Sequence, residues 1–508
     1  MTQSNNRGVD DPGMIVALCR LSNVKSIRSE NGCKTVMLLL AMLVETLGKR
    51  LGVFVKIYFF IQNHRAEMKC YSMLTLLVLL FTTAEAAPIP LARCPLITPA
   101  SPPFGRNLRS LYQYDPSYLN LNHGSYGSVP RSVTLTRRCW SDHVESSPDQ
   151  WYRYDMFDTI DQVRQKLSKY IHSASPDDVV FVDNASHGMN AVLRSLVPTL
   201  LAGKNTKILY LQTAYRMVLN TLDFLHDVYH DQLLQVNITT NVPSSSTFED
   251  AVVEAVDRAL AAEESGTVVL ASFSHIVSLP GAILPIKRLV AVCHKYGVQV
   301  LVDGAHALGH IPINVQDLNP DYYVTNGHKW LYSSKGSALL WVNPIRQKNI
   351  APTTISYEGQ GDTRFQIGFS YQGTQDMTQF MSMYAALEFR AILTTNNDTK
   401  IYDYMHQLAV AGGHILAAAW GTELLLPNNS FGAMVDVRLP SNASYDVLQH
   451  LPATLLAKYN TWVPAYGWDG EKFDNSSSKW YVRVSAQIYN DESDFKFLAN
   501  AVNEIIAG

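Results

Sequence analysis

The chain has 508 residues, of which 47% are hydrophobic and 17% are charged, and its formal net charge is −3. This length and hydrophobic content suffice to bury one large core or two moderate ones, which excludes a globally disordered protein. The nearly balanced charge provides no basic surface for a phosphate backbone, so nucleic acid is not an expected partner.

The N-terminal part begins with an apolar leader. Residues 68–86 read MKCYSMLTLLVLLFTTAEA, with one lysine, an uncharged run and a small-x-small end typical of a signal peptide. We therefore predict entry into the secretory pathway and an extracellular protein. Because a cleavable signal belongs at the start of a chain, residues 1–67 are interpreted as an upstream extension of the coding sequence. The alternatives are a membrane anchor, if this apolar segment is retained, and a cytoplasmic protein, if the signal is not used.

A proline-rich linker, residues 87–117, follows the leader. Beyond the leader the cysteines are Cys94, Cys139 and Cys293. Three widely spaced cysteines predict neither a disulfide framework nor a metal site. Cys293, in LVAVCHKYG, is most simply a small buried helix residue.

The next part of the chain, residues 118–376, alternates short aliphatic runs with helix-length amphipathic segments. The runs expected to be strands are DVVFVDN, TKILYLQ, QLLQVNIT, GTVVLASF, VQVLVDGAH and DYYVTNGH. This alternation predicts an α/β domain with a doubly wound, mainly parallel sheet. Ser246 and Glu249 predict a capping box at the start of one helix. Residues 377–508 predict a smaller C-terminal α+β domain, beginning with a long helix.

Polar residues follow several of these strands, at the sheet edge where parallel sheets bind ligands. Asp303 and His306 follow one strand, the segment 184–186 follows another, and Asn326, His328 and Lys329 follow a third. The free N–H groups of a helix beginning near Ser186 would hold a phosphate. A carboxylate at Asp303 would keep a pyridine nitrogen protonated, and a buried Lys329 would be a nucleophilic amine. Together they indicate one anionic, aromatic cofactor.

Each of these residues also has an ordinary structural interpretation. A lone aspartate after a strand is usually a turn residue, and Asn184 followed by Ala185 and Ser186 is by default a helix N-cap. The remaining alternatives are structural histidines at 306 and 328, a core side chain at Tyr215, a solvated strand residue at Arg483 and a plain turn at Gly373 and Thr374.

Seven motifs in order resemble one family from about Tyr118 to the C-terminus. They are LNLNHGSYGSVP, FVDNASHGMNAVL, SHIVSLPGAILPI, LVDGAHALGHIPI, NGHKWLYSSKGSALLWV, FSYQGTQDMTQFM and VRVSAQIYN. The chain resembles the class V aminotransferases, pyridoxal-phosphate (PLP) enzymes of fold type I. Within them it is most similar to the branch of isopenicillin N epimerase-like and hercynylcysteine sulfoxide (C–S) lyase-like enzymes.

The resemblance implies a role for each candidate around pyridoxal 5'-phosphate. Lys329 resembles the lysine that bonds to the cofactor, Asp303 the partner of the pyridinium nitrogen, and His306 a side chain near the phenolic oxygen. Tyr215 stands where a ring stacks on the pyridine. The implied phosphate cup consists of Ala185, Ser186, His328 and Asn326, the last where relatives often have serine.

Further residues are implied for the substrate and for a second subunit. Arg483 resembles the arginine that binds the α-carboxylate of an amino-acid-like substrate, and Asn122 is placed with it. Gly373 and Thr374 resemble a pair that reaches a neighbouring subunit's phosphate, which implies a homodimer with shared active sites.

The implied reaction is β-elimination from a cysteine S-conjugate or sulfoxide, that is, a C–S lyase. An amino-acid epimerase or aminotransferase is the alternative, and a non-catalytic secreted binding protein with this fold is a further one. A cysteine desulfurase needs a mobile cysteine in its C-terminal part, and this chain has none after Cys293.

Overall fold

The computed structural model describes residues 90–97, 102–198, 205–229, 232–237, 246–356, 364–474 and 476–508, all within the unit Pro90–Gly508. The predicted signal segment 68–86 and the extension 1–67 lie outside the described residues. No helix in the described ranges is long and apolar enough to cross a membrane.

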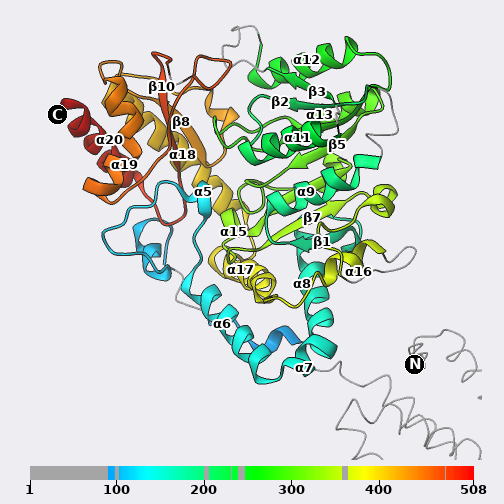
Figure 1. Ribbon diagram of the computed structural model, residues 1–508. Coiled ribbons are helices and arrows are strands. Elements are labelled where there is room, and N and C mark those ends of the chain that lie inside the picture. The colour runs from blue at the N-terminus through cyan, green and yellow to red at the C-terminus, as the bar shows by residue number, and fades with distance from the viewer. Residues whose placement is uncertain are drawn as a thin grey trace, which may run out of the picture. The chain divides into compact units, whose positions relative to one another are not determined.

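A seven-stranded sheet forms the centre of the larger domain (Figure 1). Its strands are β1 (Val179–Val182), β2 (Lys207–Leu211), β3 (Gln232–Val236), β4 (Val268–Ser274), β5 (Gln299–Asp303), β6 (Tyr322–Asn326) and β7 (Ala338–Val342). In the order β1-β7-β6-β5-β4-β2-β3, the five strands from β6 to β3 are parallel. The first six strands were predicted. β7 was missed, and it lies antiparallel between β1 and β6.

Helices cover both faces of this sheet, which explains why its strands are apolar throughout. The helices of this part are α6 (Arg131–Ser146), α7 (Pro148–Gln150), α8 (Met156–Tyr170), α9 (Ala185–Ser195), α11 (Arg216–Tyr229), α12 (Phe248–Ala261), α13 (Ile286–Lys295), α14 (Val315–Leu318), α15 (Gly327–Trp330), α16 (Arg364–Ser370) and α17 (Thr378–Thr394). Val180 packs with Met189 of α9 on one face. Phe181 stacks on Phe380 of α17 on the other, with ring centroids 4.9 Å apart. The doubly wound prediction is confirmed.

The smaller C-terminal domain is an α+β unit, as expected, but the long helix expected to begin it at residue 377 is α17, which packs on α6 and α8 of the larger domain instead. Its elements are α18 (Thr399–Trp420), β8 (Met434–Arg438), α19 (Tyr445–Tyr459), β9 (Ala465–Gly467), β10 (Trp480–Ser485) and α20 (Glu492–Ala507). The antiparallel sheet has the order β8-β10-β9, and α18 packs on both β8 and α20.

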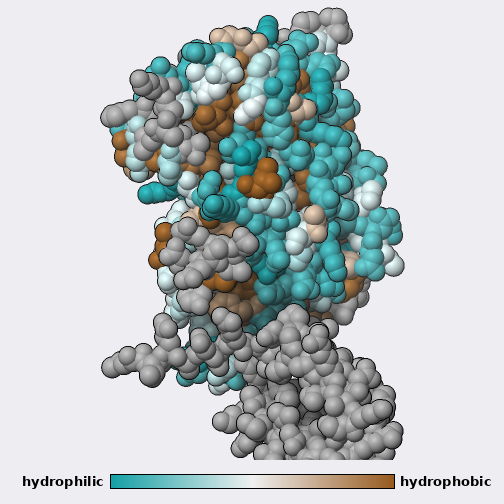
Figure 2. Space-filling model, turned by 90° about the vertical axis from the view of Figure 1, so that its right-hand side faces the viewer, coloured by the Kyte–Doolittle hydropathy of each residue, from teal (hydrophilic) through white to brown (hydrophobic). Residues whose placement is uncertain are grey.

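On the face shown in Figure 2, hydrophobic residues form separated patches among hydrophilic ones, because most apolar side chains are in the core.

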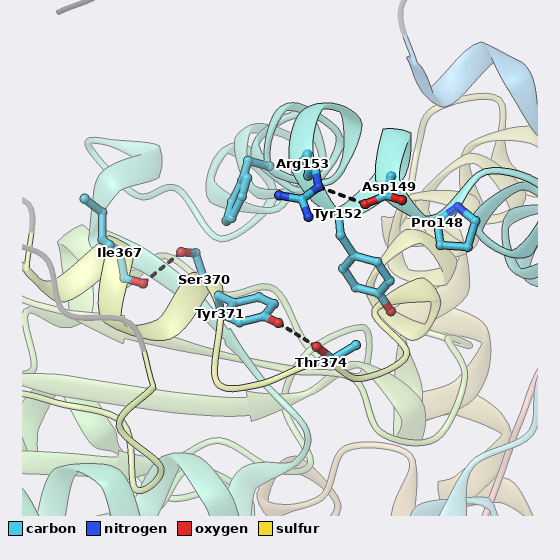
Figure 3. A pocket seen from close by; sticks show the side chains of 9 residues that line it. Pro148, Asp149, Tyr152, Arg153, Ile367, Ser370, Tyr371 and Thr374 are labelled. Atoms are coloured by element: carbon cyan, nitrogen blue, oxygen red, sulfur yellow. Dashed lines mark hydrogen bonds and ion pairs between the residues drawn. The ribbon is translucent and has the colours of Figure 1, made fainter. Parts of the chain in front are cut away.

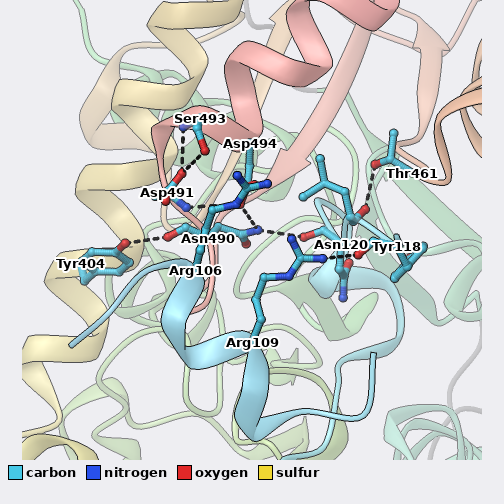
Figure 4. A network of polar contacts seen from close by, with 11 residues as sticks. Arg106, Arg109, Tyr118, Asn120, Tyr404, Thr461, Asn490, Asp491, Ser493 and Asp494 are labelled. Atoms are coloured by element: carbon cyan, nitrogen blue, oxygen red, sulfur yellow. Dashed lines mark hydrogen bonds and ion pairs between the residues drawn. The ribbon is translucent and has the colours of Figure 1, made fainter. Parts of the chain in front are cut away.

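The segment that precedes the large sheet is fastened to the small domain (Figure 4). Arg106, in the 3-10 helix Arg106–Leu111, forms an ion pair with Asp494 at 3.1 Å. Nearby, the Asn490 side chain donates to the Asn120 carbonyl at 3.2 Å. Residues far apart in sequence are thereby joined, and Asn122 is brought beside β10.

A disulfide joins Cys94 to Cys139, with the Cα atoms 5.7 Å apart. The prediction that the cysteines make no disulfide framework was therefore wrong for this pair. The sequence separation of 45 positions hides the contact in the sequence, but the segment around Cys94 lies along α6. Arg93 contacts His143 of α6 at 2.9 Å, which holds the same two segments together.

The predicted capping box at Ser246 and Glu249 is displaced by one residue. The N-cap of α12 is Thr247, whose Oγ1 accepts a hydrogen bond from the Asp250 N–H at 3.1 Å. The helix starts at Phe248 because that side chain is buried, so the residue before it takes the cap.

Candidate active site

The carboxyl ends of several strands and the start of α9 surround a pocket of about 200 Å³. Most of the predicted site residues line it, although they come from four separate segments of the chain. These are Ala185, Ser186, Tyr215, Asp303, His306, Asn326, His328 and Lys329. The parallel topology causes this convergence, because polar residues that follow neighbouring strands meet at one edge.

Lys329 lies in α15, directly after β6, and only 9% of its surface is exposed. Its Nζ atom is 3.1 Å from His306 Nε2 and 5.8 Å from the centroid of the Tyr215 ring. Burial lowers the pKa of the Lys329 amine to about 8, although the Asp303 carboxylate opposes the shift. A substantial fraction of the amine is therefore neutral near physiological pH, as a nucleophile requires.

Asp303 ends β5 and is 4% exposed. One carboxylate oxygen accepts a hydrogen bond from the Ala305 N–H at 3.0 Å. Burial raises the pKa of this carboxyl, while the Ala305 bond and Lys329 lower it. An acid group with one hydrogen bond at the pocket wall is suited to pair with a cationic ring nitrogen, which would restore its preference for the charged form.

The start of α9 lines one end of the pocket, where the resemblance predicts that a phosphate binds. Asn184 is the N-cap, and its side chain accepts a hydrogen bond from the His187 N–H at 2.9 Å. Asn326 accepts from the Ala185 N–H at 2.8 Å, which leaves its amide Nδ2 as a donor. The Ser186 hydroxyl and the helix dipole add to this donor set, so the N-cap interpretation is confirmed, and it is compatible with the phosphate cup, which stays a prediction.

His328 contributes differently to this end. Its Nδ1 is 3.3 Å from the Ser337 carbonyl, which can only accept, so the hydrogen lies on Nδ1. Burial lowers the pKa of His328 to about 4. The neutral ring therefore has a lone pair at Nε2, and His328 becomes a phosphate donor only when the anion itself favours protonation.

Arg483 of β10 is buried, at 2% exposure, beside the pocket-lining residues Ser125 and Ser278. Its guanidinium donates to Asn122 Oδ1 at 2.8 Å and to the Ser278 carbonyl at 2.7 Å. Its Nε group has no hydrogen-bond partner among the residues that the structure describes. A buried cation held by neutral acceptors is poised for a carboxylate, and the alternative of a solvated strand residue is wrong.

Two residues that the sequence analysis did not single out hold the backbone of the lysine segment. His123 Nε2 lies 2.7 Å from the Lys329 carbonyl, and Arg390 donates to the Trp330 carbonyl at 3.1 Å. A side chain at Gly127 would place its Cβ 1.9 Å from the His328 carbonyl. These contacts fix α15 from both sides. In the sequence, the only indication of them was the histidine in the motif LNHGSYG.

The aminotransferase class-V family model matches residues 151–498. The chain belongs to the class-V aminotransferase family. It is 27% identical over 418 residues to hercynylcysteine sulfoxide lyase of Schizosaccharomyces pombe, covering 79% of this chain and 97% of that protein. It is 28% identical over 413 residues to a probable chloroplastic L-cysteine desulfhydrase of Arabidopsis thaliana, covering 77% and 84%.

The fold is shared with solved structures of PLP enzymes. One is a lysine-to-alanine mutant of the enzyme C-DES with glycine covalently linked to its PLP cofactor. The TM-score is 0.62 at 17% identity, covering 78% of this chain and 98% of that one. This likeness confirms fold type I.

The pocket of this class-V chain fits an aromatic phosphate ester with an aldehyde. It offers a buried amine at Lys329, a buried acid at Asp303 and a helix N-terminus with Ser186. Tyr215 is 48% exposed and lies at the rim, so the alternative of a core side chain is wrong. The pocket thus offers the two kinds of group that PLP requires, hydrogen-bond donors for its phosphate and an amine for its aldehyde.

Gly373 and Thr374 are not part of this pocket. Thr374 lines a separate hollow of about 620 Å³, and its hydroxyl is 2.6 Å from that of Tyr371 (Figure 3). The other lining residues come from α7 and α8, the connection between them, and α16: Pro148, Asp149, Tyr152, Arg153, Phe157, Ile367 and Ser370. Within this one chain, the pair is therefore separate from the phosphate cup.

Proposed function

We propose that this class-V protein is a PLP-dependent lyase that cleaves the Cβ–S bond of a cysteine S-conjugate or sulfoxide. The observation that carries the proposal is the buried, low-pKa Lys329 amine in the same pocket as Asp303, with the buried Arg483 beside it. The similarity to a sulfoxide lyase and to a probable cysteine desulfhydrase supports sulfur as the leaving atom.

When bound, PLP supplies an electron sink for the pair released at the substrate α-carbon. Lys329 removes the α-proton, and Arg483 holds the α-carboxylate so that the Cα–H bond faces the amine. Asp303 stabilises positive charge at the ring nitrogen. The Cβ–S bond then breaks with its electron pair on sulfur, and the sulfur takes up a proton. Water then converts the rest of the substrate, which keeps the amino nitrogen and the three carbons, to pyruvate and ammonium.

The only cysteine in the described part that is outside the disulfide argues against persulfide formation. Cys293 is fully buried in α13, and burial raises the pKa of its thiol to about 12. A protonated thiol without access to the pocket cannot attack a substrate sulfur. We therefore infer that sulfur leaves directly.

The test is the product. Purified protein supplied with PLP should release pyruvate from cysteine sulfoxides or S-conjugates, measured with lactate dehydrogenase. Intact substrate whose α-hydrogen exchanges with deuterated water would favour an epimerase, and transfer of the amino group to a keto acid an aminotransferase. A protein that stays colourless with PLP would overturn the enzyme interpretation in favour of a binding protein.

We propose that the protein is a homodimer in which Gly373 and Thr374 serve the partner's site. The support is the resemblance together with the position of Thr374 outside its own pocket. Sedimentation equilibrium tests the assembly, and a monomer that retains full activity would contradict it.

We also propose that the protein matures in an oxidising compartment, in agreement with the predicted signal segment. The Cys94–Cys139 disulfide supports this location, because such bonds persist in the secretory pathway and are rare in the cytosol. Mass spectrometry of protein from culture medium should find this bond and no residues before the signal cleavage site. Reduced, cell-retained protein would contradict the proposal.

A further inference from the structure

Trp330 is a buried residue with an unusual polar contact. It follows Lys329 in α15 and is 0% exposed. Its indole Nε1 is 3.3 Å from Nδ1 of His306, and Nε2 of the same imidazole is 3.1 Å from Lys329 Nζ. Indole, imidazole and amine thus form a chain that leads from the core into the pocket.

The chemistry of the indole fixes the direction of every bond in this chain. An indole N–H can only donate, so His306 Nδ1 must be the acceptor and carries no hydrogen. The hydrogen of the neutral ring is then on Nε2. It points at Lys329 Nζ, which can accept it only as a neutral amine.

Burial keeps the ring neutral, as this arrangement requires. It lowers the pKa of His306 well below its usual value, and the charges of Lys329 and Arg483 and the neighbouring His310 and His328 add to the shift. A second proton on Nδ1 would also face the indole N–H and break that bond. Both effects oppose an imidazolium.

The indole is itself held in position by another histidine. The His310 ring stacks on Trp330, with centroids 4.0 Å apart and 28° between the planes. The Ala433 N–H donates to His310 Nε2 at 2.5 Å, so His310 Nδ1 carries the hydrogen and donates to the His306 carbonyl at 2.9 Å. Backbone groups thereby anchor the whole arrangement.

We propose that Trp330 is a positioning residue that locks His306 in its Nε2–H tautomer, so that His306 presents a hydrogen-bond donor to the reacting group instead of a second base. Without the Trp330 hydrogen bond, the His306 ring can carry its hydrogen on Nδ1 and direct the lone pair of Nε2 into the pocket. There the imidazole would compete with Lys329 for the substrate α-proton. The phenolic oxygen that the family places near His306 is an acceptor, which the same tautomer suits. The proposal rests on the proposed role of Lys329.

The first experiment needs neither cofactor nor turnover. Histidine labelled with ¹⁵N in the ring, observed in cofactor-free protein and assigned by loss of the signal in His306→Gln, reports which nitrogen carries hydrogen. We expect Nε2–H for His306 in the wild type and a mixture in Trp330→Phe. Hydrogen on Nδ1 in the wild type, or an unchanged ring in the variant, overturns the proposal.

Trp341→Phe is the matched control. Its indole is also buried, at 4% exposure, and donates to Ser173 Oγ at 2.9 Å in a part of β7 that does not line the pocket. Loss of that bond should leave the His306 signals unchanged. A change as large as that of Trp330→Phe would mean that any lost indole bond perturbs the core, and would overturn the proposal.

A second measurement separates the tautomer lock from packing. The pKa of Lys329, followed by reductive methylation against pH in cofactor-free protein, should rise by about one unit in Trp330→Phe, because the protonated amine gains an acceptor. In a His306→Gln background the same substitution should cause no rise, since a glutamine amide does not depend on the indole. An equal shift in both backgrounds would assign Trp330 to packing alone.

A deficit in lyase turnover with wild-type tautomer behaviour would count against the proposed function and leave this inference intact. If His306 carries its hydrogen on Nδ1 in a wild-type protein that releases pyruvate, this inference is overturned and the proposed function stands.

Discussion

The two hollows described above, the one lined by Thr374 and the one lined by Lys329, differ in size and in chemistry. The larger, about 620 Å³, has one charged pair, Arg153 and Asp149, with side chains 69% and 88% exposed. The smaller, about 200 Å³, is lined by Asp303, His306 and Lys329, all at or below 9% exposure. In the smaller hollow, burial makes charge expensive and shifts the pKa values of Asp303, His306 and Lys329, and we therefore expect the reactive groups there. Volume alone would have chosen the wrong site.

Removal of the amine is the strongest way to break this contrast. Lys329→Ala should reduce pyruvate release roughly a thousandfold or more, because the proton carrier and the covalent anchor of the cofactor are lost together. The visible absorption band of PLP should disappear after desalting. Lys287→Ala is the control, since this lysine is 63% exposed and pairs with Asp317. Equal losses in both variants, or a retained band, would refute the assignment of the small pocket.

The position of Arg483 beside this pocket gives the next prediction. Arg483→Lys replaces a planar fork, which bonds Asn122 and Ser278, by a point charge. We expect KM to rise roughly thirtyfold, equivalent to about 2 kcal/mol, with a smaller change in kcat. Arg438→Lys in the neighbouring strand β8 is the control, because its partner Glu423 is 60% exposed. An unchanged KM would remove Arg483 from substrate binding.

The larger features of this site were predictable, because they depend on local pattern. Six strands and the polar residues that follow them were found from hydrophobic runs. β7 met the same criterion, since Ala338–Val342 is a buried aliphatic run, but it was treated only as part of the lysine motif. The antiparallel direction of β7 depends on the turn after Lys335. The periodicity of apolar residues along a strand does not indicate the direction in which the strand runs.

The contacts that complete the site were not predictable from residue type. His123 and Arg390 act on carbonyl oxygens of residues 329 and 330, and every residue has a carbonyl. Arg483 and Asn122 are 361 positions apart and were paired only by family resemblance. Cys94 and Cys139 meet because the N-terminal segment returns along α6. Long-range contacts of this kind depend on the complete fold.

The pH dependence of cofactor capture sharpens the comparison of the two environments. Only the neutral amine attacks an aldehyde, and the pKa of Lys329 is lowered to about 8. The rate at which cofactor-free protein takes up PLP should therefore rise about tenfold per pH unit below 8 and level off above it. Stopped-flow absorbance measures this rate. A rate that is still rising steeply above pH 9 would show that the amine is solvated like a surface lysine.

The smallest expected effect concerns the large hollow. Thr374→Val removes the hydroxyl that contacts Tyr371 and, in the proposed dimer, a donor to the partner's phosphate. We expect PLP to bind about fivefold more weakly, equivalent to about 1 kcal/mol, with kcat at saturating cofactor unchanged. Tyr152→Phe, which loses a bond to the Gln375 carbonyl in the same hollow, is the control and should leave PLP affinity unchanged.

Mixed dimers of one Thr374→Val subunit and one Lys329→Ala subunit show in which subunit the Thr374 hydroxyl acts. If Thr374 acts across the interface, the single intact Lys329 lies in the Thr374→Val subunit and faces a wild-type Thr374, so its site should bind PLP with normal affinity. Weak binding there would place the hydroxyl's effect within its own subunit and would make the large hollow a remote part of the same site.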